Sequence, residues 1–352
     1  MSDSFTIALL LWYEENGRDL PWRGQTDPYA IWISEIMLQQ TRVETVIPYY
    51  EHWMSRLPTI EALARADIDH VLGLWEGLGY YQRAHNLHAA AKIIREELQG
   101  KIPTTSAELE SLPGIGAYTS AAIASMAFNE QVLALDGNLR RVLSRLINYD
   151  QIAGTSKADR IFRSWARKHI PDSSASSFNQ ALMDLGAMIC TSSAPSCELC
   201  PVSSSCEAFA LGVQDMRPVR KRMPALPHHI VSAGVFQRGG KVLIGRRPKG
   251  KLLGGLWEFP GGKCFKNETI ADCLVREWKE ELDMDIVPGI ELWVIDHTYT
   301  HFKITVHALE CHASDGNAKA NVHSEIRWAD IDKLDQFPMG KVDRTIAKLI
   351  GK

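Results

Sequence analysis

The 352-residue sequence has no run of apolar residues long enough to cross a bilayer, and it has no low-complexity tract. It also has no excess of positive charge, since 39 Lys and Arg stand against 42 Asp and Glu. The protein as a whole therefore has no net positive charge that would attract nucleic acid, and any contact with nucleic acid must come from local features. The short apolar run near the N-terminus lacks a preceding basic region and a following small-residue cleavage site. We predict an amphipathic helix there and a cytoplasmic protein without membrane contact.

The length exceeds that at which a single core usually stops growing, so two domains are expected. From residue 5 to about 210 the pattern is helical almost throughout, with apolar residues at three- and four-residue spacing in stretches such as 60–72 and 87–98. No convincing strand is present in that range. Three prolines and four basic side chains in 217–227 cannot continue a helix and indicate an extended linker.

The pattern after the linker is different. Residues 230–236 and 241–245 flank Gln237-Arg-Gly-Gly240, which is a hairpin signal, and 291–296 and 302–310 are also strand-like. Residues 270–282 form a helical stretch between them. The sequence therefore predicts a helical domain over 1–216, a linker over 217–228 and an α+β domain over 229–352.

Four of the seven cysteines lie within one short loop, with spacings of x6, x2 and x5: Cys190, Cys197, Cys200 and Cys206. An odd total and this crowding do not suit a disulfide framework. Zinc sites more often use two C-x2-C pairs with a longer spacer. A [4Fe-4S] cluster takes four thiolates and can be wrapped by one compact loop, so the pattern favours a cluster over zinc. The other three have no such arrangement and are interpreted as buried structural thiols: Cys264, Cys273 and Cys311.

A glycine-containing turn, Leu112-Pro-Gly-Ile-Gly-Ala-Tyr-Thr-Ser120, lies between two helical stretches. Gly114 and Gly116 allow a tight turn whose backbone N–H groups face outward, and a helix begins just after it. Amides exposed at the start of a helix bind a phosphate without a side-chain charge. An ordinary turn between helices is the alternative interpretation.

Two acids lie in surroundings that suit acid catalysis. Asp136, in Ala134-Leu-Asp-Gly-Asn138, starts a helix after an apolar stretch, although a simple N-cap is a common role for Asp. Glu35 lies in the otherwise apolar stretch 32–41, although a lone Glu there can also be exposed. An apolar wall would raise the pKa of Glu35, as a general acid requires.

The cysteine spacing, the hairpin followed about twenty residues later by Asp136, and the stretch around Glu35 resemble the MutY-type adenine DNA glycosylases of the helix-hairpin-helix, endonuclease III-like group. The resemblance implies an all-α glycosylase domain with a [4Fe-4S] loop over 190–206. It also implies hydrolysis of the N-glycosidic bond of adenine mispaired with 8-oxoguanine or guanine in double-stranded DNA, by a monomer. Glu35 would protonate the leaving base, and Asp136 would stabilise an oxocarbenium-like sugar.

The same resemblance implies roles for residues that periodicity does not identify. Tyr118 occupies the position of the Schiff-base lysine of bifunctional relatives, and no lysine occurs from 102 to 156, so hydrolysis without strand cleavage is expected. An endonuclease III-like lyase is the alternative. Trp75 and Tyr81 are interpreted as core residues. Tyr118 and Asn138 join the catalytic set; the adenine pocket comprises Arg18, Trp22 and Gln180; and DNA contacts comprise Gln40, Thr41, Leu78, Tyr80, Gly114 and Gly116.

From Gly262 to Met284 the sequence follows the Nudix pattern G-x5-E-x7-R-E-U-x-E-E-x-G-U, with Trp278 in place of an aliphatic residue and Asp283 in place of glycine. MutY proteins carry a similar, MutT-like C-terminal domain that recognises 8-oxoguanine. The resemblance assigns that recognition to a short polar and aromatic stretch. Its residues are Tyr299, Thr300 and His301.

The acids of the Nudix pattern fall within a turn and a half of one helix: Glu277, Glu280 and Glu281. They are close enough to share Mg2+, which would add a Nudix hydrolase activity to the glycosylase. A solvated acidic helix supported by Arg276 and Glu280 is the simpler alternative. Both interpretations stay open at this point.

Overall fold

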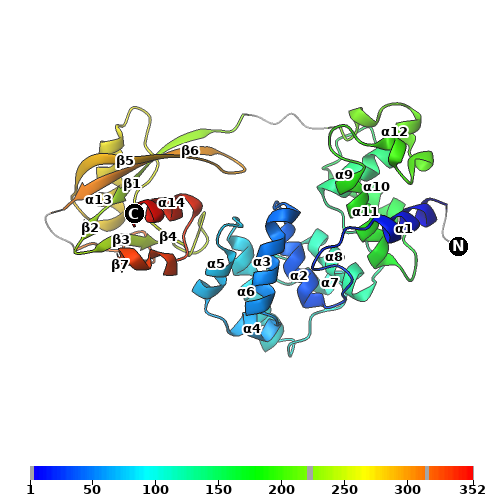
Figure 1. Ribbon diagram of the computed structural model, residues 1–352, viewed down its shortest axis with the longest axis horizontal. Helices are drawn as coiled ribbons and strands as arrows, with labels where there is room; N and C mark the ends of the chain where they lie inside the picture. Colours follow the sequence, from blue (N-terminus) through cyan, green and yellow to red (C-terminus); the bar gives the residue numbers. More distant parts are fainter. Residues whose placement is uncertain (1–3, 220–224, 314–316, 352) are drawn as a thin grey trace. The chain divides into compact units, whose positions relative to one another are not determined.

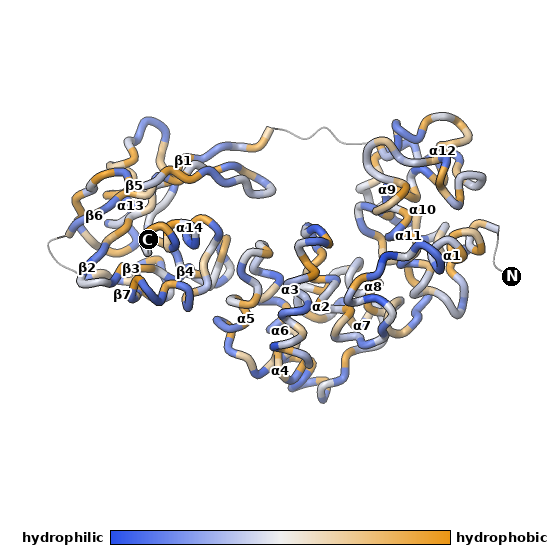
Figure 2. Tube along the Cα trace, viewed as in Figure 1, coloured by the Kyte–Doolittle hydropathy of each residue, from blue (hydrophilic) through white to orange (hydrophobic). Residues whose placement is uncertain are grey.

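The computed structural model describes residues 4–219, 225–313 and 317–351. The chain divides into two compact units: unit 1 comprises Met1–Arg65 and Asn86–Met223, and unit 2 comprises Ala66–His85 and Pro224–Lys352. Unit 2 is therefore built from two separate stretches of sequence. Hydrophobic and hydrophilic residues alternate over short intervals along the chain (Figure 2), and none of the described helices is long and apolar enough to cross a membrane.

Unit 1 is helical, as predicted. Its helices are α1 (Ser4–Asn16), α2 (Pro28–Leu38), α3 (Val43–Arg56), α4 (Ile60–Arg65), most of α6 (Gln82–Glu96), α7 (Ser106–Leu109), α8 (Ala117–Phe128), α9 (Gly137–Leu146), α10 (Ser156–Ala166), α11 (Ala175–Met188) and α12 (Glu207–Ala210). Within the described part of this unit, the β-type pairing consists of one isolated bridge between Ile152 and Val219.

The helical stretch predicted over 60–72 is interrupted. Helix α4 ends at Arg65, and α5 (Ile68–Trp75) begins after Asp67, whose side chain accepts a 2.8 Å hydrogen bond from the backbone N–H of Asp69. An aspartate that caps the second helix competes with continuation of the first. Apolar spacing alone does not reveal this break.

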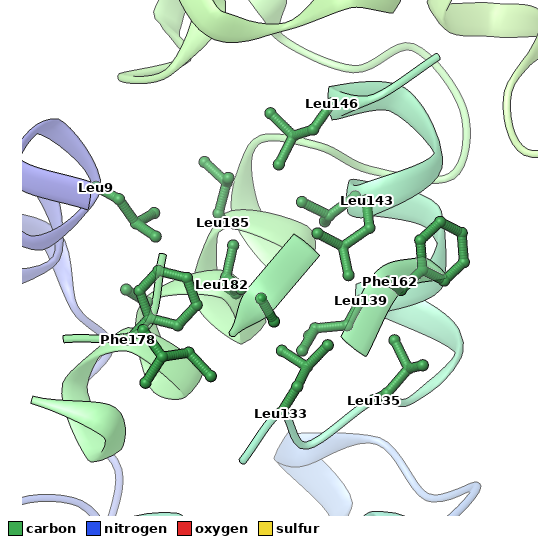
Figure 3. Close-up of a cluster of buried hydrophobic side chains, with 14 of the residues drawn as sticks. Leu9, Leu133, Leu135, Leu139, Leu143, Leu146, Phe162, Phe178, Leu182 and Leu185 are labelled. Carbon is green, nitrogen blue, oxygen red and sulfur yellow. The ribbon is translucent and has the colours of Figure 1, made fainter. Parts of the chain in front are cut away.

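The core of the C-terminal half of unit 1 is a cluster of buried leucine and phenylalanine side chains (Figure 3). Leu139, Leu143 and Leu146 form one face of α9, at the three- and four-residue spacing of an amphipathic helix. They meet Leu182 and Leu185 of α11. Three of the loop cysteines pack against the same cluster, so the core fixes the position of the cysteine loop: Cys190, Cys200 and Cys206.

Unit 2 contains two sheets (Figure 1). The first has the order β1-β6-β5, with β1 (His228–Val235) parallel to β6 (Lys303–His312) and β5 (Val287–Thr298) antiparallel to β6. The second pairs β3 (Lys241–Arg246) with β2 (Gln237–Arg238), β4 (Trp257–Glu258) and β7 (Glu325–Asp330). Helix α13 (Ile270–Leu282) packs against β1, and α14 (Lys341–Ile350) packs against β5.

The predicted strands and the helix over 270–282 are all present, and the helix has the predicted ends. Gly239 and Gly240, with φ of 58° and 76°, form the two-residue turn of the predicted hairpin. Strands β4 and β7 and helix α14 were not predicted. The linker predicted over 217–228 lies partly outside the described residues, so the domain boundaries stay a prediction.

The early segment Ala66–His85 is held in unit 2 by specific contacts. The Glu76 carboxylate accepts hydrogen bonds from Arg344 Nη2 (2.9 Å) and from the backbone N–H of Met339 (3.1 Å). Tyr81 donates its hydroxyl to the Met339 carbonyl at 3.3 Å. Trp75 and Tyr81 are buried, as predicted. The loop between them, which includes Leu78 and Tyr80, is therefore fixed within unit 2.

Candidate active site

A cavity of about 530 Å³ in unit 1 contains most of the predicted catalytic residues. It forms where α2 packs against α8 and where α9 begins. Glu35 and Asp136 are far apart in the sequence, yet both line this cavity. The other lining residues are Leu38, Gln39, Gln40, Gly116, Ala117, Tyr118, Thr119 and Gly137.

Glu35 is almost fully buried, at 4% exposure, on the apolar helix α2. The Tyr118 hydroxyl donates a 2.6 Å hydrogen bond to its Oε2. Burial raises the pKa of Glu35, whereas the hydrogen bond from Tyr118 and the charge of Arg23 oppose the rise. The nearby Asp136 carboxylate raises the pKa of Glu35 further. The site therefore favours a protonated Glu35, which a general acid requires.

Asp136 is both an N-cap and a cavity residue. Its Oδ1 accepts a 2.7 Å hydrogen bond from the backbone N–H of Leu139 in the first turn of α9. Burial raises the pKa of Asp136, and this rise is opposed by the backbone N–H groups of Leu139 and Asn138, by the charge of Arg141 and by the Asn138 side chain. Asp136 thus has more groups that stabilise its charged form than Glu35 has. If the two acids share one proton, Glu35 is the acid that carries it, and Asp136 is the acid that stays ionised.

The predicted hairpin connects the single-turn helix α7 to α8. Gly114 has a φ of 78°, and a Cβ there would lie 2.6 Å from Cβ of Asn86, so the turn requires glycine. Gly116 has an ordinary φ of −96° and no nearby atom that a Cβ would meet, so the tight turn depends on Gly114 alone. Gly116 is the N-cap of α8, and no side chain caps this helix. Its first N–H groups can therefore bind an anion.

None of the three residues predicted for the adenine pocket is among the described residues that line the cavity. Arg18 and Gln180 are connected by a buried hydrogen-bond network, and Trp22 is close to Arg18 in the sequence. Asp184, which is fully buried, accepts hydrogen bonds from Arg18 Nη2 (2.7 Å) and Arg23 Nη2 (3.1 Å). Arg23 also donates to Gln180. Trp22 is outside this hydrogen-bond network and packs edge-to-face on Tyr50, with ring centroids 5.3 Å apart.

Sequence reasoning missed Arg23 and Asp184. Arg23 joins Arg18 to Gln180 through Asp184, and its charge acts on Glu35. A signal was available for Asp184, because it is a single acid on the apolar helix α11. Arg23 directly follows Trp22, but nothing in its spacing distinguishes it from a surface arginine.

Gln40 lines the cavity directly after α2, with a φ of 57°. Thr41 follows it and donates its hydroxyl to the Gln39 carbonyl at 3.4 Å. The Gln39 side chain donates to Thr119 Oγ1 at 3.1 Å. The end of α2 is therefore tied to the first turn of α8. Of the six predicted DNA-contact residues, Gln40 and Gly116 line the catalytic cavity, and Thr41 is the next residue after Gln40 in the chain.

In unit 2 the structure joins Tyr80, which was predicted to contact DNA, to Thr300, which was predicted to recognise the orphan base, the 8-oxoguanine opposite the adenine. The hydroxyl groups of Tyr80 and Thr300 form a hydrogen bond with each other. Thr300 and His301 are exposed in the turn between β5 and β6. Tyr299 is half-buried and packs on Phe302, with ring centroids 4.9 Å apart, so this aromatic contact supports the turn.

The cysteine loop is built around one cavity that all four cysteines line, and all four carry free thiols. Arg145, whose side chain is buried, donates to Sγ of Cys190 at 3.2 Å. Among the described residues, no three of the four thiols have sulfur atoms within 4.8 Å of one another. Four free thiols around one cavity are the donor set that a [4Fe-4S] cluster takes, with one bond from each thiolate. The donor set therefore fits the predicted cluster.

The Nudix acids are engaged with basic partners. Arg276 pairs with Glu268 Oε1 and Glu277 Oε1, both at 2.8 Å, and approaches Glu280 at 3.5 Å. Glu281 is oriented differently and lies 3.9 Å from His323, and burial raises its pKa to about 7. In the described ranges these acids do not gather into a compact set of ligand atoms. Arg276 supports the helix as the simpler interpretation expects, but Glu277 and Glu281 are largely buried, so these two acids do not form a solvated face.

The two departures from the Nudix pattern have local explanations. Trp278 is buried and donates Nε1–H to the Pro260 carbonyl at 2.9 Å, so it fills the core below the loop. Asp283 ends α13 with a φ of 53°, a conformation that favours glycine and that Asp tolerates better than most residues. Lys319 and Lys279 both bind the Asp283 carboxylate.

Comparison with known proteins matches both units. Residues 33–168 match the HhH-GPD superfamily base excision DNA repair protein, and residues 231–349 match the NUDIX domain. The adenine DNA glycosylase of Buchnera aphidicola subsp. Schizaphis graminum is 43% identical over 305 residues, which are 86% of each chain. The adenine DNA glycosylase of Arabidopsis thaliana is 39% identical over 353 residues. That match covers 86% of this chain but 56% of the plant protein, so the chain spans little more than half the length of that relative.

Solved structures agree with the fold of unit 1. A thermostable thymine-DNA glycosylase is 28% identical and has a TM-score of 0.53, covering 59% of this chain and 95% of that one. The fold therefore combines an endonuclease III-like helical domain with a Nudix-like α+β domain. Because the Buchnera protein is 43% identical and 86% of its length is covered, the chain belongs to the adenine DNA glycosylase family.

Proposed function

We propose that this chain is a monofunctional adenine DNA glycosylase that removes adenine opposite 8-oxoguanine or guanine in double-stranded DNA. The observation that carries the proposal is the cavity that holds Glu35 and Asp136, in which Tyr118 donates a 2.6 Å hydrogen bond to Glu35. Two carboxyl groups in different environments divide the work of acid and charge stabiliser. A base flipped out of the duplex is accessible to such a cavity.

In the proposed reaction, Glu35 gives its proton to the leaving adenine. The bond between the sugar carbon and the base nitrogen breaks, and its electron pair leaves with the base. The Asp136 carboxylate stabilises the cation that develops on the sugar. Water then adds to that carbon, and the proton it releases restores the acid. Asn138 holds Asp136 through its backbone N–H and side chain, and Tyr118 orients Glu35.

The absence of a strand-cleaving step follows from Tyr118. Its hydroxyl is used by Glu35, and a phenol does not form a Schiff base. An endonuclease III-like lyase is the alternative, and trapping of the enzyme on DNA by borohydride would reveal it.

The remaining predicted residues are proposed as the DNA-binding surface. The uncapped start of α8 would bind a backbone phosphate. The hydrogen bond between Tyr80 and Thr300 supports a role for both in reading the orphan base. Arg18, Trp22 and Gln180 are proposed for the adenine, and the network through Arg23 and Asp184 would hold two of them in place.

We also propose that Cys190, Cys197, Cys200 and Cys206 hold a [4Fe-4S] cluster. When bound, the group crosslinks the loop 190–206 through four thiolates. Arg145 would offset part of their negative charge, since it already contacts Cys190.

For unit 2 we propose recognition of 8-oxoguanine, with Thr300 and His301 as reading residues. The ligand atoms of Glu277, Glu280 and Glu281 do not form a described group within 4.8 Å of one another, so hydrolysis of nucleotides is not part of the proposal. A cytoplasmic monomer with domains over 1–216 and 229–352 completes the proposed description.

The test is excision of adenine under single-turnover conditions from duplexes that contain A·8-oxoG, A·G or A·T. We expect fast excision from A·8-oxoG, slower excision from A·G and none from A·T. Cutting of the strand without added base or heat, or equal excision from all three duplexes, would refute the proposed function.

A further inference from the structure

Cys264, Glu268 and Cys273 come together in unit 2, although their spacing along the chain did not predict it. One sulfur or oxygen atom from each lies within 4.8 Å of the others. The prediction of buried structural thiols holds for Cys273 and Cys311 and is wrong for Cys264, which is half-buried. Cys264 is next to β1, where its N–H donates to the Ile230 carbonyl at 3.0 Å, and it belongs to the loop 259–269 that connects β4 to α13.

We propose that these three side chains form a binding site for one Zn2+ ion. Two thiolates and a carboxylate are ligands that zinc accepts, and tetrahedral zinc with Zn–S bonds of about 2.3 Å places two sulfurs about 3.8 Å apart. The ligand atoms lie within 4.8 Å of one another, so zinc binding would require the two sulfurs to close by about 1 Å or less. The proposed site has three protein ligands and a fourth position for water.

The residues around the three ligands support the site. Ser232 donates its hydroxyl to Sγ of the fully buried Cys273 at 3.1 Å. Arg276 Nε and Nη2 bind the two oxygens of Glu268 at 2.8 and 3.0 Å, and the backbone N–H of Phe265 binds Oε2 at 2.8 Å. In protein metal sites, ligating groups are held by partners of this kind. The ligands are therefore oriented before an ion arrives.

Zinc would offset most of the negative charge at the site. Two thiolates and the Glu268 carboxylate bring three negative charges, Zn2+ brings two positive charges, and the Arg276 guanidinium brings a third. Arg276 also binds Glu277 at 2.8 Å, so one negative charge remains when that carboxylate is counted. A hard cation such as Mg2+ prefers oxygen ligands and would not select the two sulfurs.

The site is separate from the other two candidate metal positions. The four-cysteine loop belongs to unit 1. Glu277 and Glu280 are on the same helix as Cys273 but are not among the three converging ligands. Zinc here would join the loop 259–269 to the first turn of α13, and its presence does not depend on the proposed glycosylase reaction.

The test measures zinc bound by the full chain, kept reduced under anaerobic conditions and retaining its iron. Competition with a chromophoric chelator counts the bound ions, and X-ray absorption at the zinc edge identifies their ligands without interference from iron. We expect one Zn2+ per chain, with two sulfur neighbours at about 2.3 Å and oxygen neighbours at about 2.0–2.2 Å. The thermal unfolding midpoint should rise with zinc concentration.

Cys264→Ser should weaken zinc binding at least ~10-fold and remove the effect of zinc on unfolding. Cys311→Ser, which changes a buried thiol outside the site, is the matched control and should bind zinc like the natural chain. Unchanged zinc affinity in Cys264→Ser would overturn the proposal. If that variant does not fold, the natural chain still decides, because four sulfur neighbours, no sulfur neighbour, no stoichiometric zinc, or a Cys264–Cys273 disulfide in protein kept from air would each refute the site.

Discussion

The Tyr118 hydroxyl lies 2.6 Å from Oε2 of Glu35, and it donates a hydrogen bond to a carboxyl group that is almost fully buried. This bond stabilises the ionised form of Glu35, whereas burial favours the protonated form, and burial is the larger influence on its pKa. Tyr118 is thereby a positioning residue that limits how far the pKa of the acid rises. The first two predictions test this pair and its partner Asp136.

Replacing either acid should stop excision without stopping DNA binding. Glu35→Gln removes the transferable proton, and Asp136→Asn removes the negative charge, so each should reduce the single-turnover rate at least ~10²-fold. Rapid-quench assays on an A·8-oxoG duplex measure the rate, and binding is measured on the same duplex. Glu44→Gln, at an exposed acid in the first turn of α3, is the control. A near-natural rate in either active-site variant would contradict the assignment.

The pH profile should be bell-shaped. Glu35 must be protonated, so the excision rate falls as pH rises through its raised pKa; Asp136 must be ionised, so the rate falls as pH drops through its own raised pKa. Tyr118→Phe removes a hydrogen bond that lowers the pKa of Glu35, and the alkaline limb should therefore move to higher pH. Tyr149→Phe, at a tyrosine of the unit 1 core, should leave that limb in place. A shift of the alkaline limb to lower pH in Tyr118→Phe would show that this account is wrong.

Reading of the orphan base should depend on the turn that contains Thr300. Loss of one or two hydrogen bonds of about 1 kcal/mol each corresponds to a fall of ~5- to 30-fold in preference for A·8-oxoG over A·G. Thr300→Ala/His301→Ala should therefore lower the ratio of the two excision rates and change the A·G rate little. Thr298→Ala, at the exposed end of β5, is the matched control. A ratio equal to that of the natural chain would assign the reading to other residues.

The cysteine loop should contain iron. Purified protein should be brown with about four irons per chain, as a cubane cluster with four thiolates requires. Cys200→Ser removes one ligand and should reduce iron content, solubility and DNA binding together, whereas Cys311→Ser should reduce none of them. Iron is measured by plasma emission spectroscopy on anaerobically prepared protein. Stoichiometric zinc in this loop and no iron would be the contrary result.

The leucine core of unit 1 should dominate its stability. Leu143 is fully buried between α9 and α11, so Leu143→Ala should lower the free energy of unfolding by about 2–5 kcal/mol. Leu211, at 64% exposure, is the comparison, and Leu211→Ala should change stability by less than about 0.5 kcal/mol. Denaturant unfolding followed by helical circular dichroism provides both values. Similar losses in the two variants would mean that this cluster does not hold the unit together.

Much of the fold could be predicted because short-range sequence patterns determine it. The three- and four-residue spacing of leucines on α9 and the Gly239-Gly240 turn each act over a few residues. The break at Asp67 was missed because a cap competes with a helix through one side chain, which periodicity does not register. Short elements such as β4 have two residues and acquire their identity from tertiary pairing alone.

The candidate site shows the same division. Glu35 and Asp136 were predicted from a motif and an apolar setting, and the structure adds that one cavity contains both. Arg23 and Asp184 were missed because their importance comes from a buried ion pair between distant segments. The convergence of Cys264 and Cys273 was missed for a similar reason, since it depends on where a loop meets a helix.

The discontinuity of unit 2 has a consequence for how the protein is made. Residues 66–85 leave the ribosome on the order of a hundred residues before the stretch that surrounds them, and synthesis proceeds at about 5–20 residues per second. Arg344 follows Glu76 by 268 residues and Met339 follows Tyr81 by 258, so both partners are absent for roughly 13–54 s at that rate. During synthesis this segment therefore lacks its partners in unit 2, while the residues of unit 1 that precede and follow it can already form their leucine core. The segment is secured only when unit 2 is complete.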